Sequence, residues 1–231
     1  MSELIEFSEE QSMLLDTAMD FCVTQSPLAK VRTQLNVEEG YDKVQWQSMV
    51  DLGWLAITIP EVYGGLGLGM ADVVPISESM GRALMGSPFL ATTLASQALI
   101  NGGSEDQKAE WLPKIAGGSM ATVALFEEEG DWDLKHLTAS GITSGSEILL
   151  TGQKTFVMDA MASELIIAST LIDGEPRLVC IQTKSVPTDQ IVREVVIDDT
   201  RRCYRVNLDG VTIPAASVLP IDCFKEIENA A

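Results

Sequence analysis

Few side chains in this sequence could act as nucleophiles or metal ligands. His136 is the only histidine, and it lies in a polar stretch with no nucleophile motif around it, so a Ser-His-Asp triad cannot be assembled. We expect His136 on the surface. The cysteines Cys22, Cys180, Cys203 and Cys223 show no CxxC pairing, and with one histidine they make no zinc site. We therefore assign no catalytic and no metal-ligating residue, and unpaired cysteines favour a reducing, cytoplasmic compartment.

A glycine-rich segment, Gly64-Gly-Leu-Gly-Leu-Gly69, invites comparison with dinucleotide-binding loops. The Rossmann fingerprint is G-x-G-x-x-G placed directly after a strand and at the start of a helix. Here the spacing is G-x-G-x-G, and Pro60 interrupts any strand that leads into it. We favour a turn in which the glycines let backbone segments pack closely.

Two short motifs in the second half of the chain could line a ligand. The first, Ala124-Leu-Phe-Glu127, ends a β-like run and precedes the acidic turn Glu128-Glu-Gly-Asp-Trp-Asp133. The second is Gly152-Gln-Lys-Thr-Phe-Val-Met158. From the residues alone, a purely structural role remains an alternative to ligand binding for both motifs. The first motif could be an ordinary strand end, and the second a strand whose Phe156 and Met158 face one side because they are two apart.

A basic pair closes the segment Asp198-Asp-Thr-Arg-Arg202. Arg201 and Arg202 could bind a phosphate. We favour a solvated pair, because Asp198 and Asp199 lie next to them and exposed ion pairs of this kind are common at surfaces.

These motifs, in this order, resemble the acyl-CoA dehydrogenase family, which uses FAD to desaturate acyl-CoA thioesters. The resemblance rests on Gly53-Trp-Leu-Ala-Ile-Thr-Ile-Pro-Glu-Val-Tyr-Gly-Gly-Leu-Gly-Leu-Gly69, on the two motifs above, and on Val206-Asn-Leu-Asp-Gly-Val-Thr-Ile-Pro214. It spans about residues 7 to 219. The Trp132-Asp133 turn looks like the variant found in members that act on steroid-type acyl chains.

The resemblance implies a set of flavin-binding residues. The family reads A-L-T-E-P at the first motif and G-x-K-x-W-I-T/S at the second, which places Leu125, Phe126 and Trp132 near the flavin. Phe156 would stack beside the ring, and Met158 would lie near flavin N5. Phe126 and Met158 stand where the family has hydroxyl residues, and neither side chain can donate a hydrogen bond as Thr or Ser would.

The resemblance also implies a reaction. In the family a Glu removes the α-proton of the thioester while the β-hydrogen leaves as hydride to the flavin. That Glu lies in a C-terminal helical bundle, and this sequence ends at Ala231, where the bundle would begin. We expect an acyl-CoA dehydrogenase-like flavoprotein that binds FAD and a fatty or steroid acyl-CoA but lacks its base domain. The alternative is a non-catalytic subunit or decayed homologue that binds an acyl-CoA dehydrogenase-like chain. Either one would form homo- or hetero-oligomers.

Helical patterns fill the first half of the chain. Capping boxes at Ser8-Glu-Glu-Gln11 and Ser104-Glu-Asp-Gln107 predict two helix starts. We expect the first helix to end at Pro27 and the second to cover about residues 41–52. A third should begin with Asp72 as its N-cap, and a fourth should cover about residues 88–100. The fifth starts at the second capping box and ends at Gly117.

Short β-rich runs replace the helices from Met120 onward. They cover Ala121–Phe126, Ile148–Thr151, Thr155–Met158, Leu165–Leu171, Arg177–Gln182, Ile191–Ile197 and Cys203–Leu208. Asp173-Gly174 and Asp209-Gly210 are favoured hairpin dipeptides. We predict an α+β protein with a helical domain over residues 1–118 and a β-barrel or sandwich domain over residues 119–231.

Composition limits the partners. The formal net charge of −19 makes nucleic acid and anionic lipid poor partners, because both are negatively charged. No apolar run approaches the roughly 18–20 residues that cross a bilayer, so we expect no membrane span. A hydrophobic content of 46% is enough for a sizeable core.

Overall fold

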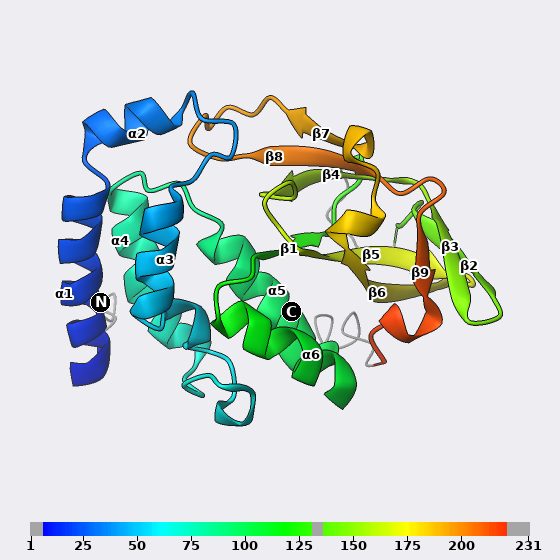
Figure 1. Cartoon of the computed structure of the whole chain (residues 1–231), viewed down its shortest axis with the longest axis horizontal. Coiled ribbons are helices and arrows are strands. Elements are labelled where there is room, and N and C mark those ends of the chain that lie inside the picture. The colour runs from blue at the N-terminus through cyan, green and yellow to red at the C-terminus, as the bar shows by residue number, and fades with distance from the viewer. Residues whose placement is uncertain (1–6, 131–135, 221–231) are drawn as a thin grey trace, which may run out of the picture.

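Helices come first along the chain and strands second, as the sequence predicts (Figure 1). The computed structural model describes residues 7–130 and 136–220. The helices are α1 (Glu9–Gln25), α2 (Leu28–Gln34), α3 (Lys43–Asp51), α4 (Val74–Arg82), α5 (Phe89–Gly102) and α6 (Glu105–Ala116). The strands are β1 (Ala121–Ala124), β2 (Ser140–Ser144), β3 (Glu147–Thr151), β4 (Gln153–Met158), β5 (Leu165–Ile172), β6 (Glu175–Gln182), β7 (Ile191–Glu194), β8 (Cys203–Asn207) and β9 (Thr212–Pro214). The predicted α+β class is confirmed.

Both predicted capping boxes form. Ser8 caps α1 and Ser104 caps α6, each through a reciprocal pair of hydrogen bonds with the glutamine three residues later. The N-cap predicted for α4 is wrong. Asp72 lies in a short 3-10 turn and accepts a hydrogen bond from the backbone N–H of Gly69, and α4 begins only at Val74. One further helix, α2, with Pro27 as its N-cap, has no counterpart among the helices predicted from the sequence.

The glycine-rich segment is a turn and not a nucleotide loop. It follows a 3-10 turn rather than a strand, and its backbone returns to residues 56–59 through hydrogen bonds such as Leu68 N–H to Ile57 O at 2.8 Å. A Cβ on Gly65 would lie 1.9 Å from the carbonyl oxygen of Ile59, so only glycine fits there.

The strands form two sheets. One has the order β1-β5-β2-β3-β9 with β6 paired to β5, and the other has the order β4-β8-β7. Asp173-Gly174 makes the predicted hairpin between β5 and β6, with positive φ at both residues. The hairpin predicted at Asp209-Gly210 is wrong, because β8 and β9 belong to different sheets.

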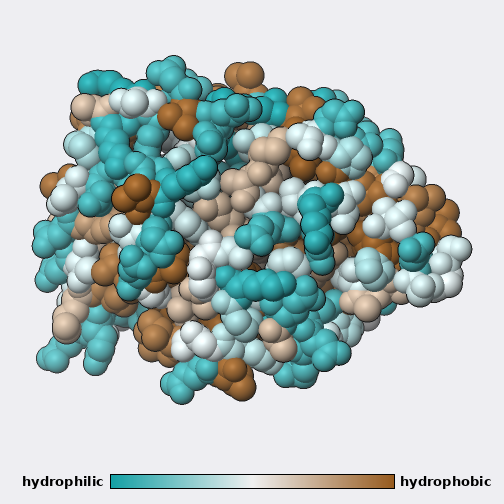
Figure 2. All heavy atoms as spheres, in the orientation of Figure 1, coloured by the Kyte–Doolittle hydropathy of each residue, from teal (hydrophilic) through white to brown (hydrophobic). Residues whose placement is uncertain are grey.

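Apolar side chains gather at several places on the surface, between areas of hydrophilic side chains (Figure 2). One such area lies at the end of the molecule formed by β2 and β3, where Ile142 and Leu149 are exposed. Others come from the β7–β8 connection, where Val195 and Ile197 are almost fully exposed. Within the described residues, no helix combines the length and apolar character needed to span a membrane.

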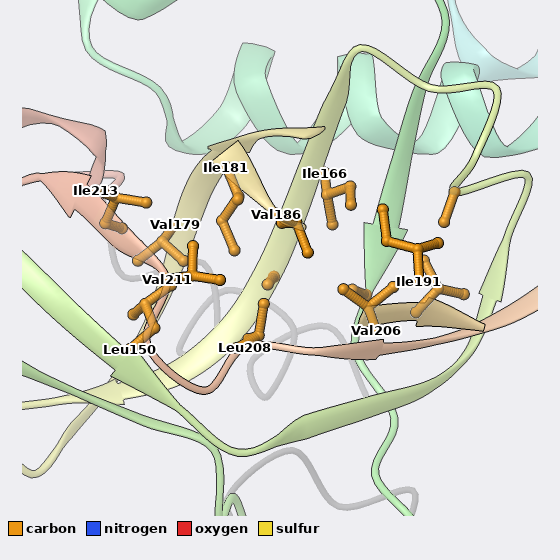
Figure 3. Packing of buried hydrophobic residues seen from close by; sticks show 14 of the residues in the cluster. Leu150, Ile166, Val179, Ile181, Val186, Ile191, Val206, Leu208, Val211 and Ile213 are labelled. Atoms are coloured by element: carbon orange, nitrogen blue, oxygen red, sulfur yellow. The ribbon is translucent and has the colours of Figure 1, made fainter. Parts of the chain in front are cut away.

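The paired strands β5 and β6 separate two hydrophobic cores. Ile166 of β5 and Val179 of β6 point into a core enclosed by the sheets (Figure 3). Residues next to these along each strand, such as Ile167 and Cys180, point to the opposite face and pack against α5 and α6. Both faces of these strands are therefore buried, which explains their nearly continuous apolar sequence. Helices and sheets share the second core, and the division into domains at residues 118 and 119 stays a prediction.

Candidate functional site

The end of β1 lies beside β4 and brings the two predicted motifs together. Phe126 follows β1, and its carbonyl oxygen accepts a hydrogen bond from the N–H of Thr155 at 3.0 Å. Two residues before the end of β1, the Thr122 hydroxyl donates to the carbonyl oxygen of Met158 at 2.6 Å. Leu125, Phe126, Phe156 and Met158 therefore come from two neighbouring segments. Trp132 lies outside the described residues.

A buried ion pair fixes the end of β1. Lys154 is fully buried, and its Nζ lies 2.7 Å from Glu127 Oε1 and 2.9 Å from the hydroxyl of Ser169. That hydroxyl donates in turn to the carbonyl oxygen of Leu125 at 3.0 Å. Each polar group in this network has a partner, as buried charges require. The network joins the strand end that carries Leu125 and Phe126 to both β4 and β5.

The same network holds Glu127 as a carboxylate. Its other partners are the N–H and hydroxyl of Thr138 and the N–H of Ala139 at 3.1 Å. Burial acts to raise the pKa of Glu127, but the hydrogen bonds from Lys154 and Thr138 outweigh it and leave that pKa below its usual value. Burial lowers the pKa of Lys154, and the nearby carboxylate only partly opposes this effect.

A β-bulge in β4 exposes Phe156. The pairing register with β8 shifts between Lys154 and Val157, and Phe156 takes a positive φ of 56°. Its side chain is 53% exposed, whereas Met158 is half-buried. Simple alternation, with both side chains on one face, therefore does not describe this strand. The bulge turns the aromatic ring toward an open cavity of about 500 Å³ that is also lined by β7 and the residues after it.

Glu194 of β7 holds the bulge in place. Its carboxylate accepts hydrogen bonds from the Thr155 hydroxyl at 2.6 Å and from the Phe156 N–H at 2.8 Å, and it pairs with Arg205 Nε at 3.3 Å. A non-glycine residue at positive φ costs free energy, and these bonds compensate for part of it. Phe156 therefore stands as a pre-positioned, exposed aromatic side chain.

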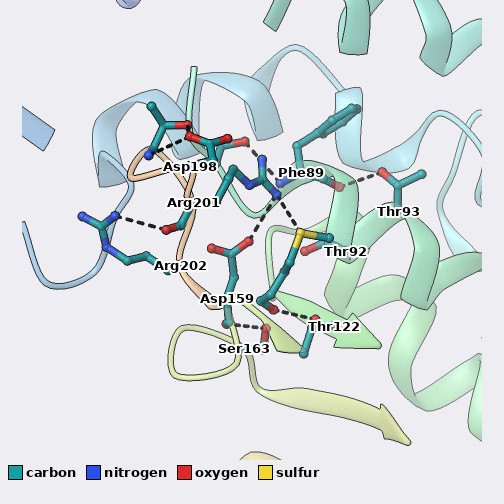
Figure 4. Close-up of polar contacts among 12 residues, drawn as sticks. Phe89, Thr92, Thr93, Thr122, Asp159, Ser163, Asp198, Arg201 and Arg202 are labelled. Carbon is teal, nitrogen blue, oxygen red and sulfur yellow. Dashed lines mark hydrogen bonds and ion pairs between the residues drawn. The ribbon is translucent and has the colours of Figure 1, made fainter. Parts of the chain in front are cut away.

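On the other side of β4, Met158 lies beside the charged pair of Arg201 and Asp159, which Figure 4 shows with the groups around it. Its sulfur accepts a hydrogen bond from Arg201 Nη2 at 3.4 Å. The same nitrogen lies 3.8 Å from Asp159 Oδ2, and this oxygen is buried without a hydrogen-bond partner. Burial raises the pKa of Asp159 to about 6, although Arg201 and Arg202 act to lower it.

The solvated pair predicted for Arg201 and Arg202 is wrong. Arg202 is 1% exposed, and its Nη2 donates to the carbonyl oxygens of Gln34, Leu35 and Val37, at the end of α2 and just after it. Arg201 is only partly buried and turns the other way, toward Met158 and Asp159. The two neighbouring arginines therefore bind different parts of the protein.

The motifs can be predicted from the sequence, but the groups that hold them in place cannot. Lys154 and Glu127 belong to those motifs, but their pairing depends on a register between β1 and β4 that no local pattern gives. Glu194 and Asp159 carried no signal of their own. His136 is exposed, as expected. The described residues contain no cluster of His, Cys, Asp or Glu that could hold a metal ion, and their three cysteines are free and buried.

The side chains and backbone groups at this site determine how well a flavin would fit it. An exposed aromatic ring beside an open cavity can stack on a flat ring system, and Phe156 provides it. Its N–H, however, is already bound by Glu194, and the Met158 sulfur is bound by Arg201. The site therefore fits a flavin through stacking, without the two hydroxyl donors that the family pattern contains.

Comparisons with known proteins agree with this fold. Residues 8–119 match the family described as "Acyl-CoA dehydrogenase, N-terminal domain". The chain is 33% identical over 132 residues to (2S)-methylsuccinyl-CoA dehydrogenase of Cereibacter sphaeroides, covering 56% of this chain and 24% of that protein. It spans at most about half the length of the curated relatives it matches.

Solved structures share the architecture. The Tcur3481-Tcur3483 steroid ACAD G363A variant aligns with a TM-score of 0.84 at 22% identity, over 96% of this chain and 60% of that one. An acyl-CoA dehydrogenase complexed with FAD from Bacillus anthracis aligns with a TM-score of 0.78 at 22% identity, over 94% of this chain and 38% of that one. At a sequence identity of 22%, the similarity to these two structures shows a shared fold and nothing more. Residues 8–119 are therefore an acyl-CoA dehydrogenase N-terminal domain by sequence, and the chain as a whole shares the fold of solved members of that family.

Proposed function

We propose that this chain is the helical and β part of an FAD-dependent acyl-CoA dehydrogenase-like flavoprotein that desaturates a fatty or steroid acyl-CoA thioester. The observation that carries the proposal is Phe156, an exposed aromatic side chain held at positive φ beside an open cavity, at a position where the family has an aromatic residue. The family match over residues 8–119 and the solved relative that contains FAD support the same cofactor. The free, buried cysteines fit a cytoplasmic location.

The described residues would bind and orient the cofactor. Phe156 would stack on the flavin ring, and the Lys154–Glu127 pair would keep the strand carrying Leu125 and Phe126 in register with it. A bound flavin would supply a hydride acceptor for the β-hydrogen of the thioester.

None of the three carboxylates at this site, Glu127, Glu194 and Asp159, suits the role of base for the α-proton. Asp159 is 5% exposed and faces Arg201, so it is not open to a substrate. Glu127 is paired with Lys154, and its pKa lies below its usual value. Glu194 is bound by Thr155, Phe156 and Arg205. Neither carboxylate can take up a proton without losing these partners, so neither suits general-base catalysis. We assign the catalytic base to a segment or chain outside the described residues.

A second candidate function is a non-catalytic subunit that associates with an acyl-CoA dehydrogenase-like chain. The steroid ACAD structure is named by two components, Tcur3481 and Tcur3483. In this chain Phe126 and Met158 replace the family hydroxyls. The nearly complete exposure of Val195 and Ile197 leaves apolar area next to the Phe156 cavity, and a partner could cover it.

Titration of FAD into the full chain, followed by flavin fluorescence, distinguishes the two functions. The flavoprotein function predicts saturable binding that weakens at least tenfold in Phe156→Ala, because the stacking surface is lost. Ile142→Ala is the matched control, since Ile142 is an exposed apolar residue on β2, away from the site, and its loss should leave FAD affinity unchanged. A folded chain that binds no FAD would contradict the flavoprotein function and support the subunit.

A further inference from the structure

Hydrogen bonds hold the backbone where the end of β4 meets the β7–β8 connection (Figure 4). The Met158 carbonyl oxygen accepts a hydrogen bond from the Thr122 hydroxyl at 2.6 Å, and the Asp159 N–H donates to the Arg202 carbonyl oxygen at 2.7 Å. Asp159 has a positive φ of 53°, which a non-glycine residue keeps only where its surroundings hold it. Because the backbone is held, any rearrangement in this region falls to the side chains.

Arg201 lies between two hydrogen-bond acceptors of unequal strength. Its Nη2 donates to the Met158 sulfur at 3.4 Å and lies 3.8 Å from Asp159 Oδ2, beyond hydrogen-bonding distance. A thioether sulfur is a weak acceptor, whereas a charged carboxylate is one of the strongest acceptors for a guanidinium. On its other side, Arg201 lines a cavity of about 250 Å³ between α4 and the β7–β8 connection, so its side chain has room to move. A small rotation of this side chain is therefore enough to exchange one acceptor for the other.

The protonation state of Asp159 decides which acceptor is the better one. Asp159 is 5% exposed, and its Oδ2 is buried without a hydrogen-bond partner among the described residues. A buried carboxylate in this condition is costly, and a protonated carboxyl group is less so. Burial accordingly raises the pKa of Asp159 to about 6, although Arg201 and Arg202 act to lower it. Asp159 therefore changes its charge near neutral pH.

The other ionisable groups around Asp159 keep one charge state over the same pH range. They are two cations and three neutral groups, namely Arg201, Arg202, Tyr41, Cys203 and Tyr204. Burial raises the pKa of all three neutral groups above the usual value, that of Cys203 to about 11. Between about pH 5 and pH 8 these three groups stay neutral and both arginines stay charged. In this cluster, only Asp159 titrates in that range.

We propose that Asp159 and Arg201 form a pH-dependent switch that controls the Met158 side chain. When Asp159 is protonated, Arg201 stays on the Met158 sulfur, which is the contact present in the structure. When Asp159 loses its proton to solvent, Arg201 turns to the carboxylate through a charge-assisted hydrogen bond and releases the sulfur. Met158 lies two residues after Phe156, so the switch acts on the strand that carries the exposed aromatic ring. The switch goes beyond the proposed function, because it belongs to the chain itself and needs no bound flavin.

The test follows the Met158 methyl group by NMR in the full chain, labelled with methyl-13C methionine. The chain has ten methionines, and the Met158 signal is the one that disappears in Met158→Leu. We expect this signal to move with pH in one transition, with its midpoint near pH 6. In Asp159→Asn the signal should stay at its low-pH position throughout. In Arg201→Gln most of the movement should be lost, because no cation remains to change partner.

Asp198→Asn is the matched control. Asp198 lies on the same connection as Arg201, but its Oδ1 is bound by the N–H and hydroxyl of Thr200. Asparagine keeps that acceptor, so the titration of the Met158 signal should survive. Unchanged signals from the other methionines establish that each variant folds.

Three outcomes would overturn the switch. The first is a Met158 signal that does not move with pH. The second is a signal that moves as in the wild type in Asp159→Asn or in Arg201→Gln, and the third is a titration lost only in Asp198→Asn. Because the measurement is made without flavin, each of these outcomes leaves the proposed FAD binding to its own titration.

Discussion

At the scale of single residues, the site is built from polar side chains whose partners are almost all supplied by the protein itself. Glu194 is bound to the bulge, and Glu127 to Lys154. Asp159 and Arg202 are exceptions, since Asp159 Oδ2 and Arg202 Nε are buried without a hydrogen-bond partner among the described residues. Buried polar groups without partners are costly, and proteins retain them chiefly where they have a use.

Asp159 should make stability depend on pH. Burial raises its pKa in the folded chain to about 6, from 3.8 for the free side chain, so the folded state binds this proton more tightly than the unfolded state does. Its contribution to stability is therefore complete below about pH 4 and is lost as the pH rises through 6. Between about pH 5 and pH 7 the loss should be about 1 kcal/mol, since one pKa unit is about 1.4 kcal/mol.

Urea unfolding of the wild type and of Asp159→Asn at these two pH values measures the loss. The asparagine variant cannot titrate at this position, so the wild type should lose stability relative to it as the pH rises. A stability difference between the two proteins that does not change with pH would contradict the assignment.

At the scale of elements, Arg202 joins the helical and strand parts of the chain. Its Nη2 donates to three carbonyl oxygens at the end of α2 and just after it, and these bonds fix that segment against the β7–β8 connection. The approach is close. A Cβ on Gly40, which has a φ of 72°, would lie 2.2 Å from Arg202 Cγ. The same β7–β8 connection carries Arg201 into the cavity wall, so Arg202 also positions that neighbour.

Arg202→Ala should lower the free energy of unfolding by about 3–5 kcal/mol, because buried carbonyl groups lose a charged donor. Hydrogen exchange should show faster exchange of the amides of residues 34–40, while amides in β5 and β6 stay protected. Arg32→Gln, an exposed arginine on α2, should change stability by no more than about 0.5 kcal/mol. Unchanged exchange at residues 34–40 in Arg202→Ala would show that the bonds do not hold this segment.

The elements show what could be predicted from sequence. Capping boxes gave the starts of α1 and α6, because a cap is a local interaction between residues three apart. β2 was missed because its sequence, Ser140-Gly-Ile-Thr-Ser144, is mostly polar, and β9 because it is short and pairs with β3, more than 60 residues earlier. The hairpin at Asp209-Gly210 failed for the same reason, since a turn dipeptide does not fix which sheet the next strand joins.

The candidate site, too, could be predicted from the sequence only in part. The motifs carrying Phe126, Phe156 and Met158 could be read from the chain, and the structure brings them together. The bulge at Phe156 could not be predicted from the sequence, because it depends on hydrogen bonds to Glu194, 38 residues away. Arg202 was placed in solvent because its neighbours in sequence are acidic, whereas its real partners lie more than 160 residues earlier in the chain.

At the scale of the whole molecule, helices and sheets share a hydrophobic core, and the site lies where the end of β1, which reaches this core, meets β4. α5 and α6 pack on β5 and β6, which fixes the β1 end beside β4 (Figure 1). A net charge of −19 gives no general attraction for an anionic cofactor, so the proposed FAD binding would rest on local groups such as Phe156 and backbone donors.

The visible absorbance spectrum of the full chain, saturated with FAD and freed of excess by gel filtration, tests the central claim most directly. Flavoprotein function predicts that the flavin bands elute with the protein, near one FAD per chain, and that they are lost in Phe156→Ala but kept in Ile142→Ala. A protein that elutes without flavin, while circular dichroism shows native helix and strand content, would contradict the account.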